Sequence, residues 1–394
     1  MTNKWQTKRL GELVDFAAGF GFPKEYQGDI AGTIPFYKVS DMNISSNTVH
    51  MYESNNKVCE VILKKIRAKV YPKGTVIFPK IGMAVFTNKK RILSTNSTFD
   101  NNVMGLIPRK INGLFLYYYL LTVDLSKLSR TTTMPSISQQ DVKKITIPFP
   151  DRQIQQQIVE NLDSIRKLQE LNQKEIEKAE ELFSTLLDSI VASKTNLQIK
   201  KIVDVAIINP PKPKFDEWDL EREVDFLPMS VLATDVPNPF PAEKKKVKEV
   251  LKGYTCFQSD DILLAKITPC FENGKTGIFK KSPDGIGFGS TEFIVIRVDK
   301  KQVLPLWVWL FIFSNKFRHG GRLRMTGSAG QKRIPVSFVE NYQIPVPSLD
   351  LQQQIVGRFQ MIENYRETCK KKKKLLNELF ESALNKTMKG ELIN

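Results

Sequence analysis

Residues 147–159 read IPFPDRQIQQQIV and residues 344–356 read IPVPSLDLQQQIV, so one thirteen-residue motif returns after 197 residues, which is half of the 394-residue chain. Eight of the thirteen aligned residues are identical, and the same shift aligns Glu181–Phe183 with Glu378–Phe380 without a gap. An insertion in a helix rotates every later side chain by about 100°, so a register kept over this length indicates a repeated helix. The chain is predicted to be one unit written twice.

A long helix is predicted after each motif. Asp151–Lys194 contains neither glycine nor proline, and Asp151 is a candidate N-cap. A helix of about 43 residues would be roughly 60 Å long, more than a small domain buries. Its predicted apolar stripe has Ile158, Ile165, Asn172, Ala179 and Leu186 seven residues apart, with Leu162, Leu168, Leu182 and Phe183 beside them.

The second helix, Ser348 to about Lys389, is predicted to pair with the first in antiparallel orientation. Its equivalent face carries Ile355, Phe359, Ile362, Leu376, Leu379, Phe380 and Leu384. The fold class is therefore α+β, with two mixed α/β domains separated by two long helices that form a coiled coil. The predicted boundaries are residues 1–150 and 198–347 for the domains, and residues 151–197 and 348–394 for the helices.

The globular segments are predicted to be mostly β with some helix, because short apolar runs alternate with turn residues. Leu114–Leu121 (LFLYYYLL) is predicted to be a buried helix, matched by residues 304–313 in the second half. The two segments also repeat faintly: Leu10–Ala17 is aligned with Ile199–Ala206, and Val76–Ile81 with Ile262–Ile267.

Composition favours a polyanionic partner. The chain has 59 Lys and Arg against 42 Asp and Glu, a formal charge of +17. The alternative is that this charge serves solubility alone. The sequence has no run of 18 apolar residues and no secretory signal at its start, so we expect a cytoplasmic protein. Four cysteines without a C-x-x-C pair and only two histidines favour neither a zinc site nor a histidine-based active site.

Two motifs resemble parts of a methyltransferase but are not predicted to act as one. Asn209-Pro210-Pro211 resembles a base-amino methyltransferase motif, yet Lys212 stands where an aromatic residue would stack on the base. Residues 285–289 mimic a glycine-rich nucleotide loop, but a strand is predicted after them rather than a helix, so we expect a β-turn. Neither a Glu-x-Lys nuclease motif nor an ATP-binding P-loop is found. We expect a chain without an active site, metal or cofactor of its own.

Basic residues cluster most densely in residues 317–333, FRHGGRLRMTGSAGQKR. Glycines let a backbone approach a duplex, and closely spaced arginines can donate to phosphates or guanine edges. For any single Lys or Arg here, a solvated surface position is the alternative.

The whole chain resembles the specificity subunit of type I restriction-modification systems. The most specific feature is P-x-x-x-x-QQ-x-IV, present in both copies, and residues 34–43, 78–86 and 267–277 resemble the family's target-recognition domains. One departure is that Gln155 and Gln352 stand where the family usually has an acidic residue, which we expect to be a small change on a helix surface.

The resemblance implies that each globular domain recognises one half of a bipartite, asymmetric DNA site, while the helices set the spacing. Methyltransferase subunits, which bind S-adenosylmethionine, would dock on the chain, and ATP- and Mg-dependent endonuclease subunits would join through them. The candidate DNA contacts are Lys38, Lys80, Lys89, Lys90, Arg91, Arg130, Lys266, Lys275, Arg318, Arg322, Arg324, Lys332 and Arg333. The candidate docking or helix-pairing residues are Gln156, Ile158, Ile165, Leu182, Phe183, Gln353, Ile355, Ile362, Leu379 and Phe380.

Two other functions stay open. The chain could be a single-chain methyltransferase that uses Asn209–Pro211 and Gly285–Gly289. It could also be a coiled-coil scaffold that binds DNA without sequence preference.

Overall fold

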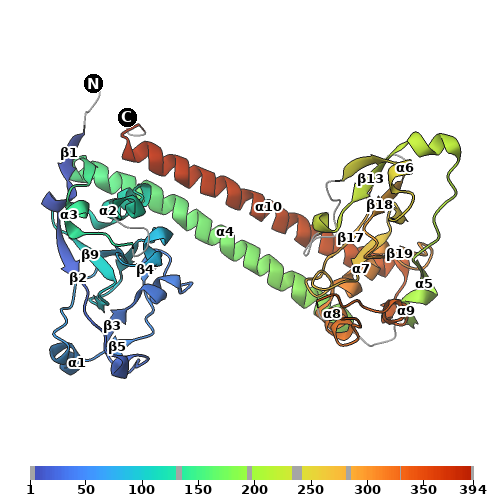
Figure 1. Ribbon diagram of the computed structural model, residues 1–394, viewed down its shortest axis with the longest axis horizontal. Helices are drawn as coiled ribbons and strands as arrows, with labels where there is room; N and C mark the ends of the chain where they lie inside the picture. The colour runs from blue at the N-terminus through green and yellow to red at the C-terminus, as the bar shows by residue number, and fades with distance from the viewer. Residues whose placement is uncertain are drawn as a thin grey trace. The chain divides into compact units, whose positions relative to one another are not determined.

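The computed structural model describes residues 5–129, 135–192, 198–232, 242–280, 285–328 and 330–391. The chain forms two compact units, Met1–Asn172 with Lys372–Asn394 (unit 1) and Gln173–Lys371 (unit 2). Each unit holds one mixed α/β domain and one section of each long helix, α4 (Arg152–Ala192) and α10 (Leu349–Met388) (Figure 1). The predicted fold class is confirmed, while the four-part division at residues 150, 197 and 347 stays a prediction.

Unit 1 contains a five-stranded sheet in the order β2-β9-β6-β7-β4, a three-stranded sheet β5-β3-β8, and the pair β1-β10. Its strands are β1 (Gln6–Arg9), β2 (Val14–Ala18), β3 (Ile34–Tyr37), β4 (His50–Met51), β5 (Lys57–Val58), β6 (Val76–Pro79), β7 (Arg91–Leu93), β8 (Thr98–Phe99), β9 (Val103–Pro108) and β10 (Thr146–Phe149). Its helices are α1 (Glu60–Lys65), α2 (Gly113–Thr122) and α3 (Gln139–Lys143), with short 3-10 helices at Leu10–Glu12, Lys24–Tyr26, Val39–Asn43, Met83–Thr87 and Leu125–Leu128.

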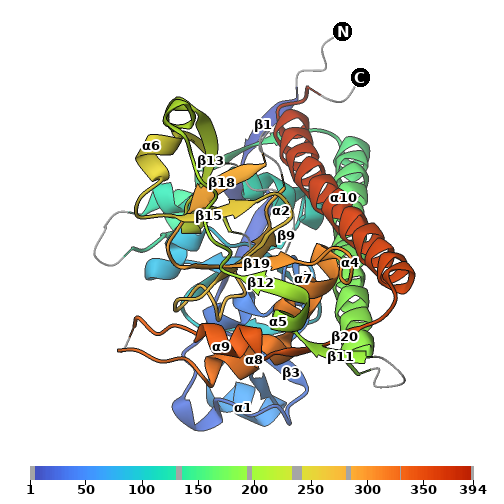
Figure 2. The same cartoon turned by 90° about the vertical axis from the view of Figure 1, so that its right-hand side faces the viewer.

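Unit 2 contains two four-stranded sheets, β12-β19-β16-β17 and β14-β13-β18-β15, and the pair β11-β20. Its strands are β11 (Gln198–Lys201), β12 (Ala206–Ile208), β13 (Glu223–Leu227), β14 (Glu243–Lys246), β15 (Thr255–Gln258), β16 (Ile262–Ala265), β17 (Thr276–Ile278), β18 (Ile286–Gly289), β19 (Phe293–Val298) and β20 (Gln343–Val346). Its helices are α5 (Ile202–Val205), α6 (Val247–Val250), α7 (Pro305–Phe313), α8 (Asn315–Arg322) and α9 (Val336–Glu340), with 3-10 helices at Glu217–Glu221 and Met229–Val231. Figure 2 shows α8 and α9 side by side at one edge of this unit.

The repeat continues into the domains, but one predicted alignment is wrong by three residues. Strand β1 pairs with β10 and β11 with β20 in matching register, Gln6 opposite Phe149 and Gln198 opposite Val346. Leu10 therefore corresponds to Ile202 rather than to Ile199. Both side chains are fully buried, whereas Ile199 is 51% exposed, so burial follows the hydrogen-bonded register and not the chance Val-Asp match.

The two predicted buried helices are confirmed as α2 and α7. Both are apolar on every side, as expected for helices enclosed within a domain. Trp307 and Trp309 of α7 are 0% and 1% exposed, and Phe115 of α2 is 0% exposed. Each of these helices packs against the long-helix sections of its own unit.

The long helices are confirmed, and within each unit they run antiparallel. Asp151 caps α4, because its Oδ1 accepts a hydrogen bond from the Ile154 amide at 2.9 Å. In unit 1 the early part of α4 shares a core with the end of α10, where Gln169 donates to Asn377 Oδ1 at 2.9 Å. In unit 2 the Phe183 and Phe359 rings lie 5.1 Å apart, edge to face.

Part of the predicted apolar stripe is wrong. Leu168, Leu182 and Leu379 are 47%, 56% and 50% exposed. From Ile158 to Phe183, the buried and half-buried positions 158, 162, 165, 169, 172, 176, 179 and 183 follow in steps of four and three. Leu168 and Leu182 stand three residues after a repeat position and fall outside this series. None of the described helices is long and apolar enough to cross a membrane.

Candidate nucleic-acid interface

Gln155 and Gln352 connect the start of each long helix to the start of each buried helix. In unit 1, Gln155 donates to the Pro150 carbonyl at 2.9 Å and accepts from the Asn112 amide at 2.9 Å. In unit 2, Gln352 donates to the Pro347 carbonyl at 2.9 Å and accepts from the Leu304 amide at 2.9 Å. We call this arrangement the glutamine clip, and it makes Asn112 and Leu304 equivalent positions.

The glutamine clip corrects the expectation of a harmless change on a helix surface. Gln155 is 2% exposed and Gln352 is 0% exposed. Both the donor and the acceptor of the amide are used at each site, and a carboxylate could only accept. The departure expected from the resemblance therefore falls at a buried hydrogen-bonding position. Gln156 and Gln353, which are predicted to dock partners or pair the helices, are the exposed neighbours.

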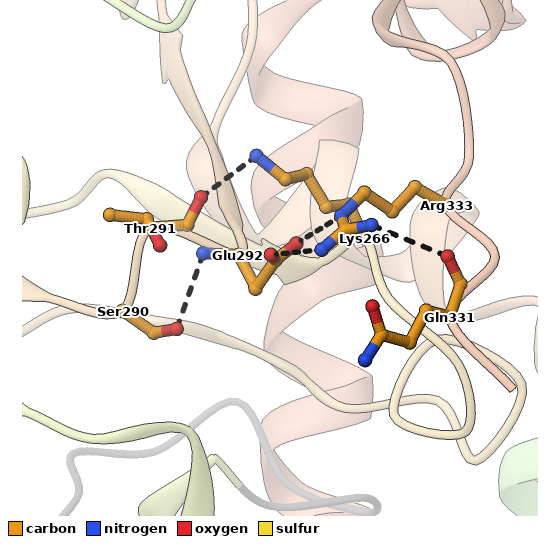
Figure 3. Close-up of polar contacts among 6 residues, drawn as sticks. All are labelled: Lys266, Ser290, Thr291, Glu292, Gln331 and Arg333. Carbon is orange, nitrogen blue, oxygen red and sulfur yellow. Dashed lines mark hydrogen bonds and ion pairs between the residues drawn. The ribbon is translucent and has the colours of Figure 1, made fainter. Parts of the chain in front are cut away.

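Two backbone hydrogen bonds join Thr326 and Arg333 as an antiparallel bridge, which we call the Thr326–Arg333 hairpin. Arg333 donates from Nε and Nη2 to the two carboxylate oxygens of Glu292 at 2.9 and 2.7 Å (Figure 3). This pairing lowers the pKa of the Glu292 carboxyl and raises the pKa of Arg333. Lys266 donates to the Thr291 carbonyl at 2.8 Å beside the same pair (Figure 3).

Arg333 and Lys266 therefore fix the base of the hairpin, and other cations of unit 2 remain available. Arg322 and Lys332 are exposed and make no side-chain hydrogen bond or ion pair with the described residues. Arg324 is exposed, although its Nη1 donates to the Gly320 carbonyl at 3.0 Å and its guanidinium lies over the Phe338 ring at 5.5 Å. In contrast, Lys275 donates to the Met229 carbonyl at 3.0 Å.

Unit 1 repeats the frame of this surface with different side chains. Lys80 corresponds to Lys266, because each directly follows a central strand. The Lys80 carbonyl accepts from the Ile137 amide, and the Lys266 carbonyl accepts from the Ile334 amide. Ser136 takes the place of Arg333. The other half-exposed candidates have local partners, since Lys38 donates to Gln27 at 2.9 Å and Lys89 donates to Asn43. Arg130 lies outside the described residues.

Lys90 and Arg91, two predicted DNA contacts of unit 1, already donate hydrogen bonds within the domain. Lys90 is 1% exposed and donates to Asn88 Oδ1 and the Val123 carbonyl at 2.7 and 2.8 Å. Burial lowers its pKa to about 8. Arg91 donates to the Lys90 and Met42 carbonyls at 2.7 and 3.0 Å. A phosphate could reach Lys90 only by displacing these interactions.

The two methyltransferase-like motifs serve the sheets of unit 2. Asn209 has a positive φ of 50°, and its Oδ1 accepts from the Val295 amide at 3.0 Å, so its side chain extends the strand pairing. The expected turn at Gly285–Gly289 is wrong, because Ile286–Gly289 is the strand β18. A Cβ at Gly287 would lie 2.4 Å from a Phe257 ring carbon, so the glycine is required by packing.

No cluster of three metal-ligating side chains occurs among the residues that the structure describes. Sequence reasoning also missed two acids, Glu292 and Glu272, that lie among the basic candidates of unit 2. The signal for Glu292 was its place directly before the apolar run of β19, at the position that Asn102 holds before β9. Glu272 had no signal, since it lies in a loop without periodicity.

Residues 2–181 and 194–379 match the family model of the type I restriction modification DNA specificity domain. The chain belongs to this family. It is 46% identical over 156 residues to the EcoEI type I restriction enzyme specificity subunit of Escherichia coli, a match that covers 40% of this chain and 26% of that protein. The EcoAI specificity subunit of the same species is 45% identical over 155 residues, 39% of this chain and 26% of that protein. These matches thus span about a quarter of the length of either relative.

More distant relatives match over more of the chain. The MjaIX specificity subunit of Methanocaldococcus jannaschii is 25% identical over 305 residues, which cover 72% of this chain and 67% of that protein. The crystal structure of a type I restriction-modification S subunit from M. genitalium has a TM-score of 0.59 at 14% identity and covers 98% of this chain and 96% of that chain. This likeness bears on the fold alone.

Proposed function

We propose that this chain is the sequence-specific DNA-recognition subunit of a type I restriction-modification complex. The observation that carries the proposal is a repeated frame with unlike surfaces: the glutamine clip and the strand pairs recur, whereas the side chains around Lys80 and Lys266 differ. Two similar domains with different contact residues suit a bipartite target whose halves differ. The chain itself has a non-catalytic role in this proposal.

Unit 2 contacts DNA through the exposed cations on α8 and the hairpin that follows it. Arg322, Arg324 and Lys332 contact phosphates or base edges, and Arg333 and Lys266 hold the hairpin in place. In unit 1 the contacts are Lys38, Lys80 and Lys89, whose side chains are partly exposed. Lys90 and Arg91 act there as structural residues.

The long helices set the distance between half-sites and dock partners. The proposed partners are methyltransferase subunits that carry S-adenosylmethionine and endonuclease subunits that use ATP and Mg, with the cytoplasm as the location. Gln156, Gln353, Leu182 and Leu379 are exposed in equivalent pairs, so they are the proposed docking positions. The residues of the apolar stripe, such as Ile158, Ile165, Ile355, Ile362 and Phe380, pair the helices instead. The proposed functional boundaries remain residues 1–150, 151–197, 198–347 and 348–394.

Footprinting of the purified complex tests the function. We expect protection of two short sequences separated by a fixed number of unspecified base pairs. A scaffold without sequence preference would protect no defined site, and that result would refute the proposal. Binding of S-adenosylmethionine by the isolated chain would support a single-chain methyltransferase instead.

A matched insertion tests the spacer. Seven residues, one heptad, are added to α4 after Asn172 and to α10 before Lys372, so that the antiparallel register of the pair is kept. Each helix lengthens by about 10 Å, which corresponds to about three base pairs of duplex. We expect unchanged half-sites with a longer gap between them, and an unchanged gap would contradict a spacer role.

A further inference from the structure

Helix α8 presents one polar face. Asn315, Arg318, His319 and Arg322 are spaced i, i+3, i+4 and i+7, which places them on the same side of the helix. On the opposite side Phe317 is 0% exposed and packs against other aromatic rings of unit 2.

Packing fixes the orientation of this face. The Phe317 ring lies 6.1 Å from Phe271, 5.0 Å from Phe338 and 4.8 Å from Tyr342. A Cβ at Gly321 would lie 2.3 Å from a Phe271 ring carbon, so the helix lies as close to its support as glycine allows. A recognition surface gains affinity when its side chains are held in place before binding.

The polar face of α8 and Glu272 line an open hollow of about 310 Å³. Every residue that lines it is polar: Glu272, Asn315, Arg318, His319 and Arg322. Glu272 accepts from Thr268 Oγ1 at 3.1 Å through Oε1, while its Oε2 has no hydrogen-bond partner among the described residues. Arg318 donates to Asn315 at 2.6 Å through Nη2, while its Nε has no such partner. Glu272 and Arg322 both line the hollow, so a hydrogen-bond acceptor and an exposed donor lie next to one another on this surface.

The charge pattern identifies the ligand. A carboxylate repels phosphate, so Glu272 does not suit a backbone contact. It suits a donor, and in the major groove Glu accepts from the cytosine N4 amino group while Arg donates to guanine O6 and N7. An acceptor beside arginine donors therefore complements the edge of a C·G base pair. The described residues of unit 1 contain no counterpart of α8, since the 3-10 helix Leu125–Leu128 follows its buried helix.

We propose that Glu272 and Arg322 recognise a C·G base pair in the half-site bound by unit 2, Glu272 accepting from cytosine N4 and Arg322 donating to guanine. The inference rests on the proposed function, because it requires that the chain bind duplex DNA. Arg318 and Asn315, which are hydrogen-bonded to each other, hold the shape of the hollow. Recognition of the other half-site does not depend on these residues.

The test uses the complete complex and a duplex library in which each position of its footprint is varied. Glu272→Gln should lower the preference for C·G at one position of one half-site by about 5- to 150-fold, the range for a single good base contact. Arg322→Ala should affect the same position. Glu217→Gln, which removes the same charge from an exposed 3-10 helix of unit 2, is the matched control and should leave every preference unchanged.

Each outcome separates the two proposals. If the unaltered complex protects no two-part site, the proposed function fails. If it does, but Glu272→Gln and Arg322→Ala keep all base preferences or weaken binding to all sequences equally, the base-pair assignment is overturned. A half-site for unit 2 that contains no C·G pair also overturns it. Unchanged recognition at the remaining positions of the unit 2 half-site confirms that the variants are folded.

Discussion

Arg166 in unit 1 and Glu363 in unit 2 occupy equivalent positions where a long helix crosses a buried helix, yet they carry opposite charges. The Arg166 guanidinium lies 5.6, 5.4 and 4.8 Å from the rings of Tyr117, Tyr118 and Phe380. Tyr118 also donates from its hydroxyl to Asp163. Unit 1 thus fills this junction with a cation enclosed by aromatic rings.

Unit 2 leaves the same junction partly hollow. Leu310 stands at the position of Tyr118 and Gln360 at the position of Asp163, and both line a cavity of about 310 Å³. Trp309 and Phe183 line it as well, and the indole Nε1 of Trp309 has no hydrogen-bond partner among the described residues. The same backbone arrangement therefore accepts different side chains at this junction. The glutamine clip joins the long helix to the buried helix in both units, whichever side chains lie between them.

The clip itself should give the largest effect. Gln352→Ala leaves the Leu304 amide and the Pro347 and Gln302 carbonyls without their partner, so we expect unit 2 to lose about 3 kcal/mol of stability. Gln155→Ala removes one hydrogen bond fewer and should cost unit 1 about 2 kcal/mol. Hydrogen exchange at the starts of α7 and α2 measures both. Equal losses, or a loss below about 1 kcal/mol, would show that the clip does not hold the frame.

A second difference between the units should appear as a pH dependence. Lys90, which directly precedes β7, corresponds to Thr276 of β17, as the registers Val76–Ile92 and Ile262–Ile278 show. Burial lowers the pKa of Lys90 from 10.5 to about 8, so its charged form costs stability at neutral pH. As pH rises from about 8 to 10.5 the unfolded chain binds the proton that the folded chain has lost, and stability increases.

Lys90→Met removes this titration. At neutral pH we expect the variant to be more stable than the parent. The difference in their free energies of unfolding should decrease by up to about 1.4 kcal/mol for each pH unit between about 8 and 10.5. Denaturant unfolding of both proteins at a series of pH values gives the difference directly. A difference that is constant with pH would mean that Lys90 keeps its ordinary pKa.

The aromatic cage of unit 1 should contribute less. Arg166→Met keeps the apolar stem and removes the charge, and we expect a loss of about 1 kcal/mol, since cation–π contacts contribute roughly 0.5–2 kcal/mol. Thermal unfolding with hydrogen exchange in α2 reports it. Lys167→Met, at the adjacent exposed position of α4, is the control and should change stability by less than about 0.5 kcal/mol. Matching losses in the two variants would show that the aromatic cage contributes nothing.

The smallest effect should be a gain in unit 2. Leu310→Tyr together with Gln360→Asp copies the filled junction of unit 1, and cavity filling of this kind stabilises by about 0.5–2 kcal/mol. We expect the lower end, because Glu363 and Lys280 also line the space. Leu310→Tyr alone should increase stability less, since the new hydroxyl then lacks the carboxylate that accepts from Tyr118 in unit 1. A double variant that is less stable than the parent would show that the cavity is narrower than the ring.

The helices and the repeat could be predicted from the sequence because periodicity and internal identity report on them directly. The long helices, the buried helices α2 and α7 and the cap at Asp151 follow from such patterns. The sequence did not predict the exposure of Leu168 and Leu182. The residue three positions after a repeat position and the one four positions after it can both be apolar, and only the placement of the partner helix decides which of them is buried. The burial of Gln155 and Gln352 was missed for a related reason: hydrogen bonds to distant backbone have no sequence period.

Within the candidate interface, the sequence located the basic region but could not separate anchored cations from available ones. Arg333 and Arg322 are similar in sequence context, yet Glu292 binds only the first. Lys90 and Lys89 are adjacent, and only Lys90 is enclosed. These distinctions depend on contacts between loops that lie far apart in the chain, and composition does not encode them.

The pairing of β1 with β10, and of β11 with β20, has an evolutionary consequence. Each domain begins and ends on neighbouring strands beside a glutamine clip, so the chain enters and leaves the domain at adjacent points. A genetic exchange with crossovers in these strands would replace one domain and leave the long helices and the other domain unchanged. New combinations of targets could arise in this way without any adjustment of the frame that carries them.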